Sequence, residues 1–183
     1  ATGTGFSGLD IGTTDLRRGG IYSLNGSHIA LYTNASNSGD ALTERFRIAS
    51  DGSLSTPTAG TSNVRFGVNA GNSIASGGNF NTVVGDEAGT ALTTGNRNVA
   101  LGKDALLTDT LGNRATAVGV GALQTQNFTT STDNYNTAVG FIAGQSITTG
   151  IENTLIGGLA GDALTDADGN VAFGYVALSN DQL

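Results

Sequence analysis

The side chains that could support catalysis are few and scattered along the 183 residues. The only histidine, His28, lies in a predicted strand, and the sequence does not group it with a serine and an aspartate as a catalytic triad. The carboxylates near recurring glycines are interpreted as solvated turn positions, at Asp86, Glu87, Asp104 and Asp162. No paired carboxylates of a glycosidase groove are indicated. We therefore predict a protein that is not an enzyme.

Metal and nucleic-acid chemistry are not indicated either. The chain has no cysteine, so thiolate metal sites and disulfides do not arise, and the glycine-rich nonapeptide of calcium-binding repeats is missing. A net charge of −7 with only eight Lys and Arg gives no basic stripe for a phosphate backbone. No apolar run approaches membrane-spanning length. The sequence predicts no cofactor, no bound metal, no nucleic-acid partner and no membrane insertion.

The best candidate for molecular recognition is a polar segment at residues 124–135, Gln-Thr-Gln-Asn-Phe-Thr-Thr-Ser-Thr-Asp-Asn-Tyr. It combines two aromatic rings with amides and hydroxyls, a mixture suited to stacking on sugars and hydrogen-bonding their hydroxyl groups. A spacer loop without function is the alternative interpretation, and Phe141 and Tyr175 are secondary candidates. The candidate receptor-binding residues are Asn127, Phe128, Thr129, Asp133 and Tyr135.

This segment interrupts a repeat that occupies the chain from Asn63 onward. Each repeat has an Asn, replaced once by Ala, then two residues, a large apolar residue, a Gly and an Ala three residues later. A short fixed period is the signature of a solenoid, in which each repeat forms one coil. The repeat glycines are spaced 18, 17, 17, 21, 17 and 17 residues apart, at Gly67, Gly85, Gly102, Gly119, Gly140, Gly157 and Gly174. We predict about seven coils of ~17 residues.

The residues before each repeat glycine are apolar on both faces of a short strand. With the glycine numbered 0, positions −1 and −3 share one face, which we predict to line the coil. Position −2 lies on the other face, and because a strand apolar on both faces is covered on both, a neighbouring chain is predicted there. The predicted interface residues are Val83, Ala100, Ala117, Ala138, Leu155 and Ala172.

The return side of each coil has its own apolar position at +7. It is Ile or Leu in four coils, whereas Asp109 and Gln126 occupy it in two others. In those two coils we expect the nearby Leu107 and Leu123 to substitute for it.

The first sixty residues lack the repeat. We predict a connecting segment over 1–18, a small β-strand module over 19–60 and the repeat β-roll over 61–183. The module has three expected strands, at 20–24, 28–33 and 44–49, separated by turn sequences. Because the chain begins with Ala and contains no Met, we expect it to be a piece of a longer polypeptide.

Two segments carry a resemblance to known families. The phrase Asn136-Thr-Ala-Val-Gly-Phe-Ile-Ala143 resembles the coil repeat of YadA-like heads in trimeric autotransporter adhesins. It is even more similar to the longer-period version in the tail fibres of tailed bacteriophages. Leu42-Thr-Glu-Arg-Phe-Arg-Ile-Ala-Ser-Asp-Gly52 also resembles a segment frequent in phage tail fibres. The resemblance implies an all-β fold, a trimeric left-handed parallel β-roll or solenoid preceded by a small β-module.

The same resemblance implies a function. It is that of a structural and host-attachment segment of a homotrimeric phage tail fibre, located in the virion. Its expected partners are two further copies of the chain, other tail proteins, and a glycan or protein receptor on the bacterial cell surface. The head of a bacterial trimeric surface adhesin, on the bacterial cell surface, is the alternative. A depolymerase-type tail spike is a third interpretation.

Overall fold

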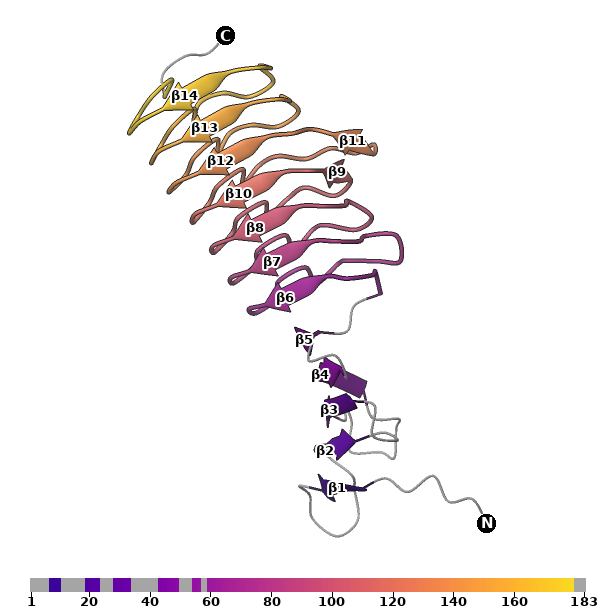
Figure 1. The fold of residues 1–183 in the computed structure, drawn as a ribbon. Helices are drawn as coiled ribbons and strands as arrows, with labels where there is room; N and C mark the ends of the chain where they lie inside the picture. The colour runs from indigo at the N-terminus through magenta and orange to yellow at the C-terminus, as the bar shows by residue number, and fades with distance from the viewer. Residues whose placement is uncertain are drawn as a thin grey trace. The chain divides into compact units, whose positions relative to one another are not determined.

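The chain divides into two units, residues 1–57 and 58–183, and each is described by itself. The computed structural model is all-β, and no helix occurs among the residues that it describes (Figure 1). Those residues are 7–10, 19–23, 28–33, 43–49, 54–56 and 59–179.

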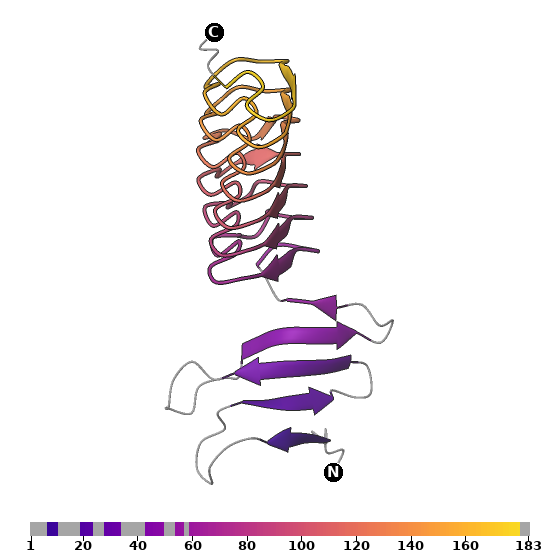
Figure 2. The same cartoon turned by 90° about the vertical axis from the view of Figure 1, so that its left-hand side faces the viewer.

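The first unit is a five-stranded antiparallel sheet in which each strand pairs with the next one along the chain (Figure 2). Three strands are close to the predicted ones, but the sheet also recruits residues 7–10 from the segment expected to be a connection. Strands that follow one another in a chain usually lie side by side in a sheet, which favours this simple order. The strands are β1 (Ser7–Asp10), β2 (Gly19–Ser23), β3 (His28–Thr33), β4 (Thr43–Ala49) and β5 (Leu54–Ser55).

The second unit is a parallel β-solenoid of about six turns, which confirms the architecture predicted from the repeat (Figure 1). Each repeat contributes one three-residue strand, and every strand pairs in parallel with the strand of the next coil. The seven strands are β6 (Val64–Phe66), β7 (Thr82–Val84), β8 (Val99–Leu101), β10 (Thr116–Val118), β12 (Thr137–Val139), β13 (Thr154–Ile156) and β14 (Val171–Phe173). A second, two-stranded parallel sheet pairs β9 (Gly112–Asn113) with β11 (Thr132–Asp133).

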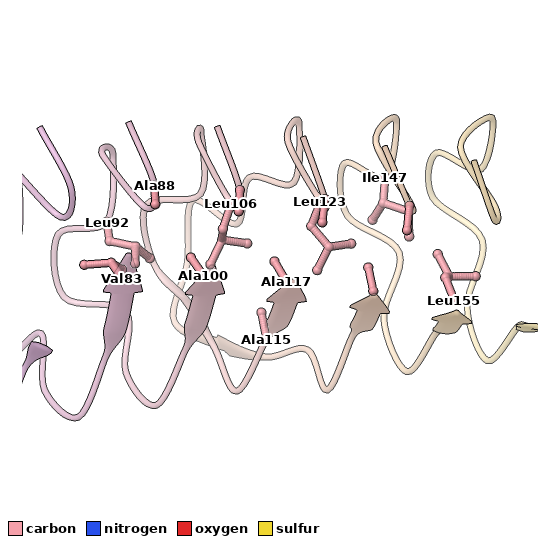
Figure 3. Close-up of a cluster of buried hydrophobic side chains, with 14 of the residues drawn as sticks. Val83, Ala88, Leu92, Ala100, Leu106, Ala115, Ala117, Leu123, Ile147 and Leu155 are labelled. Atoms are coloured by element: carbon pink, nitrogen blue, oxygen red, sulfur yellow. The ribbon is translucent and has the colours of Figure 1, made fainter. Parts of the chain in front are cut away.

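The two faces of the seven-stranded sheet are the reverse of those predicted. Position −2 points into the coil, where Figure 3 shows these side chains rising toward those of the return side. In the six coils from β7 to β14 this residue is at most 2% exposed in a single chain, so the prediction that placed it on the outer face is wrong; in the first coil the position is Arg65, which is half-buried. The six side chains assigned to a chain–chain interface therefore lie inside their own coil: Val83, Ala100, Ala117, Ala138, Leu155 and Ala172.

Side-chain size explains this assignment better than hydrophobicity does. Both faces of each strand are apolar, so alternation alone does not say which one is internal. The coil is narrow and also accommodates the alanine at position +3, and small residues at −2 fit into it. The larger residues at −1 therefore point outward, and Phe66, Leu101 and Phe173 are 50%, 44% and 81% exposed.

Each coil has one large apolar residue on its return side, at position +7 in most coils and at position +4 in others. Most coils have Gly at +4 with Leu or Ile at +7, and a Cβ added at Gly89 would lie 2.9 Å from a Leu92 methyl carbon. In the coils with Asp109 and Gln126 at +7, position +4 is leucine instead. Leu123 is buried as expected, whereas Leu106 and not the half-buried Leu107 fills the core of the preceding coil.

The repeat glycines are required where successive coils approach each other. Gly102 has a φ of +134°, and a Cβ added there would lie 2.5 Å from the backbone oxygen of Gly119 in the next coil. The same close contact with the next repeat glycine recurs from Gly67 to Gly157. Any side chain at position 0 would therefore force neighbouring coils apart.

We expect Gly102→Ala to lower the free energy of unfolding by at least about 3 kcal/mol, because backbone strain and the clash with Gly119 add together. Gly169→Ala is the matched control, since Gly169 also has positive φ (+67°) but nothing lies within 4 Å of an added Cβ. It should cost only about 1–2 kcal/mol. Equal losses in chemical denaturation of the two variants would contradict this account of coil stacking.

Candidate functional site

A ladder of buried asparagines fixes the backbone just before each strand. At position −4, the Asn Oδ1 accepts a hydrogen bond of 2.8–2.9 Å from the backbone N–H at the same position of the next coil. Its Nδ2 donates to a backbone carbonyl at the turn that precedes the next coil's strand. Both ends of each amide are thus satisfied inside the protein. The ladder asparagines are Asn63, Asn81, Asn98, Asn136 and Asn153.

The ladder is interrupted at the coil that precedes the inserted segment. Ala115 occupies position −4 there and has no amide to offer to the next coil. The buried side chain of Asn134 takes its place, because its Oδ1 accepts the N–H of Asn136 at 2.9 Å. The Nδ2 of Asn134 has no hydrogen-bond partner among the residues described. Part of the inserted segment therefore repairs the backbone pairing that the alanine leaves open.

The same region contains a buried polar network. The Asp109 carboxylate accepts hydrogen bonds from the backbone N–H groups of Gly112 (3.0 Å) and Phe128 (3.1 Å) and from Gln126 Nε2 (2.6 Å). Gln126 Oε1 in turn accepts from Asn136 Nδ2 at 2.9 Å. Burial raises the pKa of the Asp109 carboxyl above its ordinary value, while these hydrogen bonds act in the opposite direction. The network is fully enclosed, so its role is to hold the insertion in place.

The structure separates the five predicted receptor-binding residues into two groups. Phe128 is only 6% exposed, so its ring is enclosed and the expectation that it stacks on a receptor is wrong. Asn127 is half-buried, and its Oδ1 accepts a hydrogen bond from Thr110. Thr129, Asp133 and Tyr135 are exposed. Only these last three remain available at the surface.

Asp133 and Tyr135 meet at a residue that the sequence did not single out, Arg114. Its guanidinium lies 2.8 Å from the Asp133 carboxylate and hydrogen-bonds the Tyr135 hydroxyl. It also lies over the Tyr135 ring, 5.3 Å from the centroid. Arg114 comes from the preceding coil, so tertiary stacking creates this exposed cluster.

The cluster is part of a longer row of exposed side chains at position −5, one per coil. Arg97 lies over the ring of Phe80 at 5.5 Å from the centroid, in the same way that Arg114 lies over Tyr135. Backbone hydrogen bonds between neighbouring coils hold the row in register, for example from the N–H of Arg114 to the carbonyl of Asn96 at 3.0 Å. We call four successive members of this row, Phe80, Arg97, Arg114 and Tyr135, the arginine–aromatic column; Ser62 precedes them in the row, and Glu152 and Gly169 follow. The repeat register could have identified it, since each residue precedes its glycine by five positions.

The groups that this surface presents are guanidinium groups and aromatic rings. Among the residues that the structure describes, no group of three or more His, Asp or Glu side chains could hold a metal ion. In the same part of the chain, no helix is long and apolar enough to cross a membrane. Guanidinium groups and aromatic faces recognise anions and planar or ring-shaped groups.

Comparison with protein-family models, with curated proteins and with solved structures found no match for this chain. The conclusions about the column therefore rest on its geometry. The resemblance of the repeat to phage tail fibres and adhesin heads remains an expectation from the sequence.

The raised pKa of Asp109 makes its contribution to stability depend on pH. A carboxyl whose folded pKa lies above its unfolded value of about 3.9 stabilises the fold fully below that value, and this contribution is lost as pH rises through the folded pKa. Asp109→Asn does not titrate, so its stability relative to the wild type should increase from about pH 3.5 to 7. The measurement is denaturant unfolding of both proteins at several pH values and fixed protein concentration.

Gln126→Met is the control for this experiment. It removes a hydrogen bond that lowers the pKa of Asp109 but keeps the titrating carboxyl. This variant should therefore retain the pH dependence of the wild type or show a steeper one. A difference between the wild type and Asp109→Asn that does not vary with pH would contradict the prediction.

Proposed function

We propose that this chain is a structural and host-attachment segment of a homotrimeric phage tail fibre. Three copies pack their β-rolls, of left-handed coil, around a threefold axis. The repeat phrase and the segment 42–52 support the class of protein, and the parallel solenoid supports its architecture. The proposal includes no catalytic activity.

The observation that carries the proposal is the outer face of the seven-stranded sheet. In each coil, a Val or Thr at position −3 and a large apolar residue at −1 point away from the core. Val64, Phe66, Leu101, Val171 and Phe173 are among the exposed large hydrophobic residues of the chain. Each coil thus contributes at least one apolar side chain to this face, and exposed apolar patches of this kind mark interaction sites. Two further copies of the chain, each with the same face, would cover it.

The solenoid also supports a mechanical role. Each coil contacts its neighbours through backbone hydrogen bonds, the asparagine ladder and the tight glycine contacts, with no flexible link among residues 59–179 that separates one coil from the next. A stack of this kind is a stiff rod. Three copies would present three identical surface columns, and linked sites raise the avidity of an individually weak contact.

The head of a bacterial trimeric adhesin would share these features. The repeat period of 17 residues favours the phage fibre, because the resembling adhesin heads have a shorter repeat. The two classes differ in what surrounds the segment, since adhesins have a downstream coiled-coil stalk and a membrane anchor.

Sedimentation equilibrium tests the trimer. The wild type should sediment at about 55 kDa, three times the 18.3 kDa of one chain. Val118→Lys places a charge on the outer sheet face, where burial of an unpaired charge is costly, and should yield folded monomer. Thr125→Lys, an exposed position on the return side of a coil, is the control and should stay trimeric. A monomeric wild type, or a trimeric Val118→Lys, would overturn the assigned interface.

Attachment is tested with the fluorescently labelled wild-type trimer on a panel of bacterial strains. We expect binding to a subset of strains that differ in their surface glycans or proteins. Absence of binding across the panel would contradict the attachment role and leave the structural role unaffected.

A further inference from the structure

One cation of the arginine–aromatic column has no partner for its charge. The basic residues of the described solenoid are four, and Lys103 and Arg114 form ion pairs with Asp104 and Asp133. Arg65 donates from Nε to a backbone carbonyl. The only contact that the structure records for the Arg97 guanidinium, among residues 59–179, is the face of the Phe80 ring. An exposed and oriented guanidinium therefore remains available to an external anion.

The backbone at this position makes large side chains costly. Phe80, Arg97, Arg114 and Tyr135 have φ values of 60°, 59°, 64° and 52°, in the left-handed region that bulky residues rarely adopt. Gly169, at the same position of the last coil, shows that glycine is accommodated there. The side chains are exposed, so they do not serve the core. Every coil has a positive φ at this position, including Ser62, Glu152 and Gly169, so the conformation belongs to the repeat backbone, and what distinguishes the column is the side chains that it carries.

The surroundings limit which anion fits. The column has only two arginines, of which Arg114 is already paired with Asp133, and Glu152 follows in the same row, so it offers no basic stripe for the continuous phosphate backbone of a nucleic acid. A ligand with separated carboxylates and apolar ring faces suits it better. Neighbouring parallel strands lie about 4.8 Å apart, so Phe80 and Tyr135, three coils apart, stand about 14 Å from each other. The two aromatic residues therefore bracket the two arginines along an extended ligand.

We propose that the arginine–aromatic column binds an acidic saccharide, a chain of sugars with carboxylate groups. This inference rests on the proposed attachment function and names the class of receptor. The planar guanidinium of Arg97 donates two parallel hydrogen bonds to one carboxylate of the ligand. The ring of Phe80 holds this guanidinium in place. Phe80 and Tyr135, which are 53% and 49% exposed, contact sugar rings at either end of the column with the parts of their rings that the guanidinium groups leave uncovered. Asp133 fixes the orientation of Arg114 through their ion pair.

Binding to a defined set of oligosaccharides tests the proposal. The acidic probes are oligogalacturonate, hyaluronan oligosaccharides and oligosialic acid, and the neutral probes are methyl-esterified oligogalacturonate and dextran oligomers. The full wild-type chain should bind at least one acidic probe. If it binds oligogalacturonate, it should bind the methyl ester of that probe more weakly. Arg97→Gln should weaken this binding roughly tenfold, since it removes charge-assisted hydrogen bonds.

Two further variants separate site chemistry from general charge. Lys103→Gln removes the same charge from an exposed residue at position +1 of the same repeat, outside the column, and should bind like the wild type. Arg97→Lys keeps the charge but loses the planar fork, so its affinity should lie between those of the wild type and Arg97→Gln. Circular dichroism and sedimentation on each variant verify that it remains folded and assembled as the wild type is.

Several outcomes would overturn the proposal. They are binding to none of the acidic probes, or equal binding to acidic and neutral probes. Equal losses of affinity in Lys103→Gln and Arg97→Gln, or stronger binding to a single-stranded oligothymidylate than to the acidic probes, would also overturn it. The attachment function fails differently. If Arg97→Gln adsorbs to bacterial strains like the wild type, the column is not the receptor site but attachment stands. If the wild type adsorbs to no strain, attachment fails whatever the saccharide results.

Discussion

The distance between successive coils is the constraint on which the rest of the structure depends. Parallel strands pair at about 4.8 Å, and the chain must turn at each coil without widening this separation. Glycine at position 0 permits the backbone approach, because a Cβ at Gly102 would lie 2.5 Å from the next coil's backbone. The buried asparagine ladder then holds the other end of each strand at the same separation. Together they fix each coil on the one before it.

A thin coil has little interior, and this explains how its apolar residues are distributed. Alanine at +3 and small residues at −2 fill most of the core, and the balance between +4 and +7 adjusts the remaining volume. Larger apolar residues at −1 have no space inside and point outward. The outer sheet face therefore carries an apolar residue at −1 in every coil, and Phe66, Leu101 and Phe173 are exposed in one chain, which is why the proposed function includes further copies.

The inserted segment shows how an irregular coil is tolerated. Ala115 removes one amide from the ladder, and Asn134 and the Asp109–Gln126 network supply alternative hydrogen bonds within the same coils. Phe128 is enclosed with them. The inserted residues near β11 then leave Asp133 and Tyr135 at the surface beside Arg114. The inserted segment thus supplies the hydrogen bond that is missing from the ladder and adds Tyr135 to the exposed arginine–aromatic column.

The sequence by itself determined the repeat, its period, the parallel solenoid and the positions of three of the five N-terminal strands, because glycine spacing and short apolar stretches are local signals. It also located the insertion and identified Asp133 and Tyr135. Only the tertiary structure decided which face of each strand is internal, since both are apolar and the available volume selects the smaller side chains. Only coil stacking placed Arg114 beside Tyr135 and Arg97 beside Phe80, residues 21 and 17 positions apart in the chain. Likewise, only the tertiary structure showed that Phe128 is enclosed and that its backbone N–H donates to the buried carboxylate of Asp109 in the coil before it.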